Sequence, residues 1–286
     1  MMVAKFLPGG QGIASGFRDA LALSWRLALL HRKPEADHDK VLTAWYMERK
    51  QQLEKSLAAT IVNGEYVTES DPVKVFIREW YMWAVQLVPS WRREIQKGPR
   101  AAGMTRYRYA KGFPFIGDMS GGINLPQVYA CDLRTKKLSF TDDLLFSPVK
   151  HGLFQLLILP RNIEELEELQ TGLTDIDTIS NGLIRADEAT VIIQSTDSRL
   201  SLNGRQYSQA VTRLATADEF AADPILCKNR PPPIGYDEWR LGKEVENKKF
   251  VVVRFDRFTF ALCDTSAQLK EAVGRIEGSL HLKASL

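Results

Sequence analysis

The chain has 286 residues. It contains 38 lysines and arginines and 35 aspartates and glutamates, which gives a formal net charge of +3. Charges of both signs are mixed along the sequence without a basic stripe, which argues against nucleic acid as a partner. No apolar run approaches the roughly 20 residues of a membrane span, and the first residues lack the apolar stretch of a signal peptide. We therefore expect a soluble, cytoplasmic protein of about two domains, without membrane contact.

Three helices are predicted in the first hundred residues. Apolar residues follow a helical face from Ile13 to about His31 and surround the helix almost completely, which indicates a buried helix. A second helix is predicted from Asp39 to about Gly64, because apolar residues recur there at spacings of three and four. Pro72 suits the first turn of a third helix, which Pro89 should end or bend.

Residues 98–126 are rich in glycine and proline and lack either helical or strand periodicity, which indicates a domain boundary. We assign residues 1–97 to a helical domain, residues 98–125 to a linker and residues 126–286 to an α/β domain. Strands are predicted in the last domain at QVYAC, LFQLLIL, ATVIIQ, FVVVRF and RFTFAL, and helices at NIEELEELQTGL and from about Ser266 to Ile276.

The cysteines and histidines indicate no metal or redox centre. Cys131, Cys227 and Cys263 are far apart, odd in number and never in CxxC spacing, so neither a disulfide framework nor a zinc site is expected. The four histidines are dispersed, without cysteine or carboxylate at ligand spacing. We expect no metal ion and a reducing compartment.

A glycine-dense stretch with Gly9, Gly10, Gly12 and Gly16 lies at the start of the first predicted helix and forms a loop before it. Such glycines allow positive φ angles and a close approach to bare backbone, and the helix would point its unpaired amides into the loop. The loop could hold an anion or an electron-rich carbonyl, or it could be only a tight turn into a buried helix. It matches neither the P-loop pattern GxxxxGK[ST] nor the dinucleotide pattern GxGxxG.

The segment PGGQGIASGFRDALALSWRLALL resembles the second FAD-contacting motif of the flavoprotein aromatic hydroxylases, the group of p-hydroxybenzoate, phenol and 3-(3-hydroxyphenyl)propionate hydroxylases. The residues that match in order are Pro8, Gly10, Gln11, Gly12, Gly16, Arg18, Asp19, Ala20, Trp25, Arg26 and Leu27. The later segment WYMERK, residues 45–50, is similar to the YExER helix that follows in this family.

This resemblance implies that the backbone of Gly10, Gln11, Gly12, Ile13 and Ala14 faces the pyrimidine edge of an isoalloxazine ring, with the helix dipole directed at N1 and the C2 carbonyl. A preorganised dipole would stabilise the negative charge of reduced flavin there.

Three further residues of the matching segment lie inside the predicted helix, and we assign them structural roles first. Arg18 and Asp19 are read first as a structural pair that orients the helix, with a direct cofactor role as the alternative, and Trp25 as a core residue rather than a stacking partner.

The last part of the chain resembles the C-terminal thioredoxin-like domain of the phenol hydroxylase branch. KKFVVVRFDRFTFAL is similar to that domain's strand, Arg-x-Asp, strand ending, with Arg254 and Asp256 matching and Phe255 in place of the usual proline. The expected fold class is therefore α/β, with a helical remnant of an FAD-binding domain followed by a thioredoxin-like α/β domain. Since no CxxC is present, this domain is expected to pack against the hydroxylase body or a second subunit.

The resemblance implies an FAD-dependent monooxygenase that hydroxylates an aromatic, phenol-like small molecule of the kind found in secondary metabolism, with NADPH or NADH as reductant and a possible homodimer. The sequence lacks the βαβ unit with its GxGxxG turn and the GD dipeptide, so the match covers the C-terminal portion of such an enzyme. The alternative is a non-catalytic interaction or assembly module derived from that family.

Overall fold

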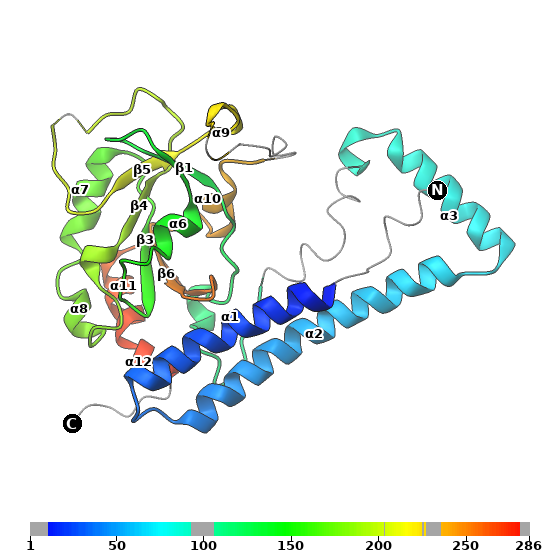
Figure 1. Ribbon diagram of the computed structural model, residues 1–286, viewed down its shortest axis with the longest axis horizontal. Helices are drawn as coiled ribbons and strands as arrows, with labels where there is room; N and C mark the ends of the chain where they lie inside the picture. Colours follow the sequence, from blue (N-terminus) through cyan, green and yellow to red (C-terminus); the bar gives the residue numbers. More distant parts are fainter. Residues whose placement is uncertain (1–10, 93–105, 203, 225, 227–235, 281–286) are drawn as a thin grey trace. The chain divides into compact units, whose positions relative to one another are not determined.

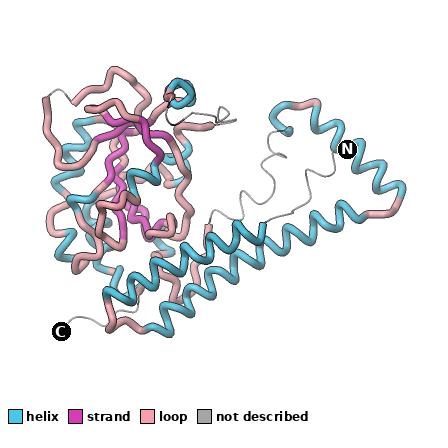
Figure 2. Tube along the Cα trace, in the orientation of Figure 1, coloured by secondary structure: helices cyan, strands magenta, loops and turns pink. Residues whose placement is uncertain are grey.

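The computed structural model describes residues 11–92, 106–202, 204–224, 226 and 236–280. The chain divides into two compact units. The helical unit takes Met1–Ser24 and Leu42–Tyr107, and the sheet unit takes Trp25–Val41 and Arg108–Leu286. All strands of the described residues belong to the sheet unit, as Figure 2 shows. The chain is thus mixed α and β, as predicted.

Three long helices stand where the apolar periodicity predicted them, namely α1 (Gln11–Arg32), α2 (His38–Thr68) and α3 (Pro72–Gln86). The first begins two residues earlier than expected, and the second runs four residues beyond the expected end at Gly64. Among the described residues, no helix combines the length and the apolar character needed to cross a membrane.

The ends of α3 follow directly from local sequence. Asp71 caps the helix, because its carboxylate accepts hydrogen bonds from the amides of Val73 at 2.8 Å and Lys74 at 3.3 Å. Pro72 occupies the first turn, where its missing N–H is not needed. The helix ends at Gln86, three residues before Pro89, because proline cannot continue a helix and disfavours helical backbone in the residue before it.

The sheet has seven strands in the spatial order β2-β1-β5-β4-β3-β6-β7. The strands are β1 (Tyr129–Asp132), β2 (Leu138–Phe140), β3 (Phe154–Ile158), β4 (Thr190–Ile193), β5 (Val211–Leu214), β6 (Phe250–Arg254) and β7 (Thr259–Cys263). Neighbours β3, β4 and β5 run parallel, whereas β6 and β7 on one side and β1 and β2 on the other are antiparallel. The predicted strands are all present, while β2 and β5 were not predicted.

Short helices cover both faces of this sheet. They are α6 (Thr141–Leu145), α7 (Ile163–Thr171), α8 (Ile176–Ile179), α9 (Ala217–Ala222), α10 (Arg240–Glu244), α11 (Ser266–Gly274) and α12 (Ile276–Ser279), with 3-10 turns η2 (Gly117–Met119) and η3 (Ala186–Glu188). Figure 1 shows α7, α8 and α11 on one side of the sheet and α6 and α10 on the other. Every residue of β3, β4, β6 and β7 is buried, which is the pattern of strands covered on both faces.

The segment that precedes the sheet runs along its edge strand. The amide of Ile116 donates to the carbonyl of Phe260 at 2.9 Å, and the amide of Gly122 donates to the carbonyl of Thr259 at 2.8 Å. A Cβ at Gly121 would collide with the carbonyl oxygen of Phe260, so only glycine allows this close approach. The end of the glycine-rich stretch is therefore part of the sheet unit's packing.

Candidate functional site

The first turn of α1 contains the residues that the sequence assigned to a cofactor. Gly10 lies outside the described residues. Gln11, Gly12, Ile13 and Ala14 form the beginning of the helix. Gly12 was predicted in a loop before the helix, and this was wrong, because the helical hydrogen-bonding pattern already begins at Gln11.

Gly16 falls within the predicted helix, and the structure places it in the second turn of α1. A Cβ at this position would meet no atom within 4 Å, and Gly16 is not among the residues with positive φ. Neither backbone strain nor close packing therefore requires glycine here. The apolar pattern of the surrounding residues extends the helix through a position that sequence alone marks as a breaker.

The ends of α1 carry opposite electrostatic character. The first four amides of a helix have no partner within it and give its N-terminus roughly half a positive charge. No acidic side chain occupies the first turn of α1, whereas His31 and Arg32 lie in the last turn, where cations are favoured. The N-terminus of α1 is therefore free of acidic residues that would oppose an anion or a polarised carbonyl.

An ion pair connects α1 to α2 within the helical unit. The Arg49 Nε donates to Asp19 Oδ1, the Arg49 Nη1 donates to Gln52 Oε1, and the Arg49 Nη2 lies 3.4 Å from Ser15 Oγ. Only 9% of the Arg49 side chain is exposed, against 43% of Asp19. One guanidinium on α2 thus contacts two successive turns of α1.

Asp19 has a structural partner on the neighbouring helix. The sequence prediction treated Arg18 and Asp19 as a structural pair that orients the helix, and the carboxylate of Asp19 is engaged by Arg49 of α2. Burial, and next the charge of Arg49, lower the pKa of Arg18, whereas Tyr107 and Asp19 act in the opposite direction. Neighbouring residues on a helix point in different directions, so a residue on an adjacent helix is better placed for a direct contact.

Trp25 and Arg26 of α1 belong to a buried cluster of the sheet unit. Arg254 at the end of β6 makes two hydrogen bonds to Asp256, Nε to Oδ1 at 3.0 Å and Nη2 to Oδ2 at 2.6 Å. The Arg26 Nη1 lies 3.9 Å from the same Asp256 Oδ2. The Trp25 ring lies 4.6 Å from the Arg26 Cζ and 5.2 Å from the Arg254 Cζ. The first and last motifs of the chain therefore meet in one cluster.

This cluster, Trp25, Arg26, Arg254 and Asp256, is shielded from solvent. Trp25 is 3% exposed and Arg26 is fully buried, so the expectation that Trp25 is a core residue is confirmed. Although burial alone would raise the pKa of the Asp256 carboxyl, the charge and hydrogen bonds of Arg254 lower it. The carboxylate is thus held ionised between two guanidiniums, which gives the cluster a structural and electrostatic role.

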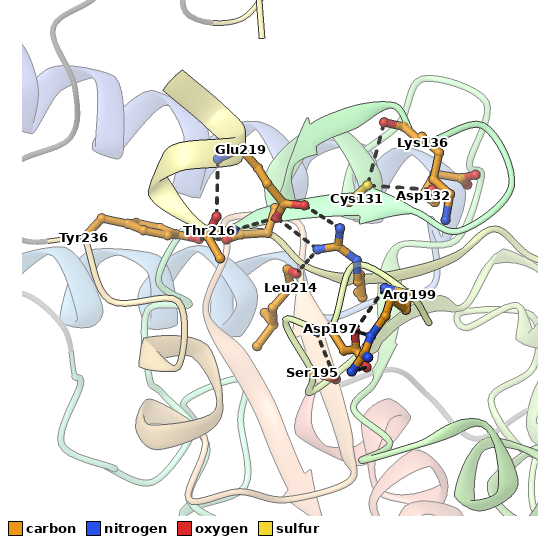
Figure 3. Close-up of polar contacts among 12 residues, drawn as sticks. Cys131, Asp132, Lys136, Ser195, Asp197, Arg199, Leu214, Thr216, Glu219 and Tyr236 are labelled. Atoms are coloured by element: carbon orange, nitrogen blue, oxygen red, sulfur yellow. Dashed lines mark hydrogen bonds and ion pairs between the residues drawn. The ribbon is translucent and has the colours of Figure 1, made fainter. Parts of the chain in front are cut away.

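A second ion pair with a buried guanidinium involves strand β5, and it was not predicted from the sequence. Arg213 of β5 donates from Nη1 to Glu219 Oε2 at 3.0 Å and from Nη2 to Glu219 Oε1 at 2.5 Å. The same Glu219 caps α9 together with Thr216. The Arg213 Nη1 also donates to the carbonyl of Leu214 at 2.8 Å. Figure 3 shows Leu214, Thr216 and Glu219, with Asp197 and Arg199 on a neighbouring loop. The Thr-x-x-Glu capping pattern of α9 was the available sequence signal.

The cysteines of the sheet unit are buried. Burial raises the pKa of the Cys131 thiol, and it raises the pKa of the Cys263 thiol to about 12, which keeps both thiols neutral at neutral pH. Within the described ranges, no three histidine, cysteine or carboxylate side chains gather as metal ligands would. Cys227 lies outside the described residues.

The sequence and the structure of the chain were compared with protein families, curated proteins and solved structures. No protein-family profile and no curated protein matches the sequence. Among solved structures, the chain is similar to the flavin-dependent monooxygenase PieE, solved in complex with FAD and substrate, at 15% sequence identity and a TM-score of 0.49. The match covers 96% of this chain and 45% of the PieE chain, so this chain spans less than half the length of that protein. A likeness of this size assigns the chain to no family.

Proposed function

We propose that this chain acts in FAD-dependent monooxygenation of an aromatic, phenol-like small molecule. In this proposal the first turn of α1, with Gly10, Gln11, Gly12, Ile13 and Ala14, faces the pyrimidine edge of the isoalloxazine ring. The observation that carries the proposal is the ion pair between Asp19 and Arg49. It joins the two segments, residues 8–27 and 45–50, on which the resemblance to the aromatic hydroxylases rests.

The hydrogen-bond donors in the first turn of α1 suit the pyrimidine edge of a flavin. The first amides of a helix have no partner within the helix, Gly12 adds no side chain, and no carboxylate lies in the first turn of α1. Reduced flavin carries negative charge at its pyrimidine edge, which a helix N-terminus stabilises. When bound, FAD would supply the oxygen chemistry, with NADPH or NADH as the proposed reductant.

The described side chains would orient this helix. Arg49 holds Asp19 and reaches Ser15, which fixes the second and third turns of α1 against α2. Trp25 and Arg26 pack against Arg254 and Asp256 in the sheet unit. Preorganised dipoles stabilise charge because they need no reorientation during the reaction, so the contacts of Arg49 serve the function that we propose for the first turn.

We further propose that residues 126–286 form a thioredoxin-like domain. Support comes from the parallel β3-α7-β4 unit, the antiparallel hairpin β6-β7 and the terminal helix α11, in the sheet order β4-β3-β6-β7. Arg254 and Asp256 flank Phe255 at the turn of the hairpin, as the resemblance implied. The buried, neutral cysteines support a packing role for this domain.

Flavin binding by the purified chain tests the proposal. The wild-type chain would be titrated with FAD before and after chemical reduction, and binding followed by flavin absorption and fluorescence. The Gly12→Asp variant places a carboxylate in the first turn of α1, and we expect it to weaken binding of reduced FAD by about three- to tenfold more than binding of oxidised FAD.

The matched control is Gly64→Asp, which introduces the same side chain at a helical glycine of α2 where a Cβ meets no atom within 4 Å. This control should leave both affinities unchanged. A folded chain that ignores FAD in both redox states would contradict the proposal and favour the non-catalytic module. Equal weakening of oxidised and reduced FAD by Gly12→Asp would remove the assigned role of the helix dipole.

A further inference from the structure

Helix α3 of the helical unit is exposed on almost every side. Among its residues only Val85 is buried. Its exposed apolar residues, which we call the α3 face, are Val73, Phe76, Ile77, Trp80, Tyr81, Trp83 and the C-cap residue Leu87. The charged residues are exposed as well, at 67% for the Lys74 side chain and 61% for the Glu79 side chain. A helix that packs within its own domain buries its apolar side, and α3 does not.

The α3 face forms one continuous side of the helix. At about 100° per residue it covers an arc of roughly 160° from Trp83 through Trp80 to Tyr81. Lys74 falls just beyond the border at Tyr81, and Glu79 falls beyond the border at Trp83. No charged residue of α3 lies within the arc. The helix is therefore amphipathic, and its apolar side is open to solvent.

The sequence of α3 and of the segment after it is basic, although the whole chain is nearly neutral. Residues 72–107 of the helical unit contain seven lysines and arginines and two glutamates. The rest of the chain contains 31 basic and 33 acidic residues, so this segment carries the positive charge of the protein. A basic amphipathic helix is typical of proteins that bind an anionic lipid surface.

Lys74 lies where it can contact lipid headgroups beside the α3 face. Its Nζ lies 3.3 Å from Glu69 Oε2, and the lysine side chain is 67% exposed against 31% for the glutamate. Ion pairs at such exposed positions contribute little, so this contact holds the ammonium only weakly. A lysine can lay its methylene groups along an apolar surface while its charge stays in water or among phosphates.

The aromatic residues of this region are those that favour a membrane surface. Tryptophan and tyrosine are enriched where the acyl chains meet the headgroups, because their rings combine an apolar body with a polar N–H or O–H. Trp80, Tyr81 and Trp83 are each more than half exposed, and so is Trp91 after the helix. A second copy of the chain fits this surface less well, because two such segments would bring like charges together.

We propose that the α3 face binds the surface of an anionic phospholipid membrane, with its apolar arc at the boundary of headgroups and acyl chains. Lys74 and Arg92 then contact the phosphates. The expectation of no membrane contact rested on the lack of an apolar run long enough to span a bilayer. A helix that lies in the interface needs no such run, because only one of its sides enters the lipid.

Cosedimentation of the full chain with vesicles tests this proposal. We expect the wild type to bind vesicles of phosphatidylcholine with about 30% phosphatidylglycerol, and to bind vesicles of phosphatidylcholine alone much more weakly. Trp80→Glu should weaken binding at least about tenfold, because it places a carboxylate in the middle of the apolar arc. The matched control is Val149→Glu, which adds the same charge at a residue that is 77% exposed in the sheet unit.

A second pair of variants tests the role of charge. Arg92→Glu should weaken binding to the anionic vesicles at least about fivefold, since each basic residue near the surface contributes to the attraction. Arg199→Glu makes the same change in the sheet unit, at a side chain that is 90% exposed, and should bind like the wild type. Binding of the wild type should also weaken as the salt concentration rises.

Circular dichroism establishes that each variant is folded, and Phe76→Glu replaces Trp80→Glu if that variant unfolds. A wild-type chain that stays in the supernatant with anionic vesicles would overturn the proposal. Equal binding to neutral and anionic vesicles would overturn the assigned partner, and so would binding that the α3 variants retain. A chain that ignores both vesicles and dimerises in sedimentation velocity would assign the face to a second copy. None of these readouts involves FAD, so this proposal and the proposed function are tested separately.

Discussion

Asp19 of α1 and Arg49 of α2 form an ion pair in which the guanidinium is nearly buried and the carboxylate is half exposed. The two residues are separated by 30 positions, and each belongs to a segment that resembles a different part of the hydroxylase motif. Arg49 also donates to Gln52 of its own helix. The pair therefore connects the helix of the candidate site to its neighbour at the level of the second and third turns.

A double-mutant cycle on Asp19→Ala and Arg49→Ala should give a coupling energy of about 1 kcal/mol in urea unfolding, because Arg49 is shielded from water and fixed by further hydrogen bonds. The control is the pair Lys50 and Glu54 on α2, which is exposed and 3.9 Å apart. Its coupling should be below about 0.5 kcal/mol. Equal coupling in both cycles would contradict a special role for the Asp19 pair.

Asp256→Asn should destabilise the chain by about 3–5 kcal/mol at neutral pH, because the guanidiniums of Arg26 and Arg254 would lose a buried counter-charge. The folded protein lowers the pKa of Asp256, so its stabilising effect is complete above the unfolded value of about 3.9 and disappears as the pH falls through the folded value. The difference between the two proteins in thermal unfolding should therefore shrink in acid.

The control for this measurement is Asp264→Asn, whose carboxylate is 48% exposed and lies 3.9 Å from Lys248. This substitution should lower the free energy of unfolding by less than about 0.5 kcal/mol. An Asp256→Asn variant as stable as this control would show that the buried cluster does not need its carboxylate.

Lys150 should make the stability of the chain depend on pH in the alkaline range. Burial lowers the pKa of Lys150 from 10.5 to about 8, while its Nζ donates to Thr190 Oγ1 at 2.6 Å. The unfolded chain therefore binds more protons than the folded chain between about pH 8 and 10.5, and the wild type gains stability over this window. Lys150→Met should be more stable than wild type at pH 7 by about 1–2 kcal/mol, after loss of the hydrogen bond.

This advantage of Lys150→Met should decrease as the pH rises from about 8 to 10.5, as measured by urea unfolding at several pH values. The exposed Lys111→Met serves as the control and should show no such trend. A constant difference across the pH range would mean that the Lys150 amine is protonated normally in the folded chain.

Glu219→Gln should cost about 2–3 kcal/mol, because the Arg213 side chain is only 2% exposed and would keep a buried charge without its carboxylate. Glutamine can still accept a hydrogen bond from the Thr216 amide, so the helix cap is largely kept. The loss of stability would therefore come mainly from the broken ion pair. The pKa of Glu219 is lowered by its hydrogen bonds to Arg213, which is consistent with an ionised pair. The neighbouring Asp218→Asn, at an exposed position, should change stability little.

The sequence alone was sufficient for the three long helices and most strands. Helical periodicity is a local property, and Asp71 with Pro72 defines the start of α3 through contacts within four residues. The strand β5 escaped prediction because Arg213 is a charged residue in a buried strand. Its charge is acceptable only because Glu219 reaches it from α9, and nothing in the strand itself reveals that contact.

The candidate site was predicted as residue types but not as an arrangement. Two separate resemblances pointed to Asp19 and Arg26 and to Arg254 and Asp256, but neither predicted the contact of Asp19 with Arg49 on the next helix. Which carboxylate meets which guanidinium depends on how helices and strands pack over long sequence separations. The contact between Arg26 and Asp256 spans most of the chain, and no local pattern encodes it.

The sequence by itself determined the three helices of residues 11–86, because these depend on hydrogen bonds and periodicity within a few turns, although α1 begins two residues earlier and α2 ends four residues later than predicted. It also determined that α3 is rich in apolar residues. Only the tertiary structure decided that Phe76, Trp80 and Trp83 of this helix are exposed while Val85 is buried. Burial is a property of what packs against a helix, and that information is distributed over the whole chain.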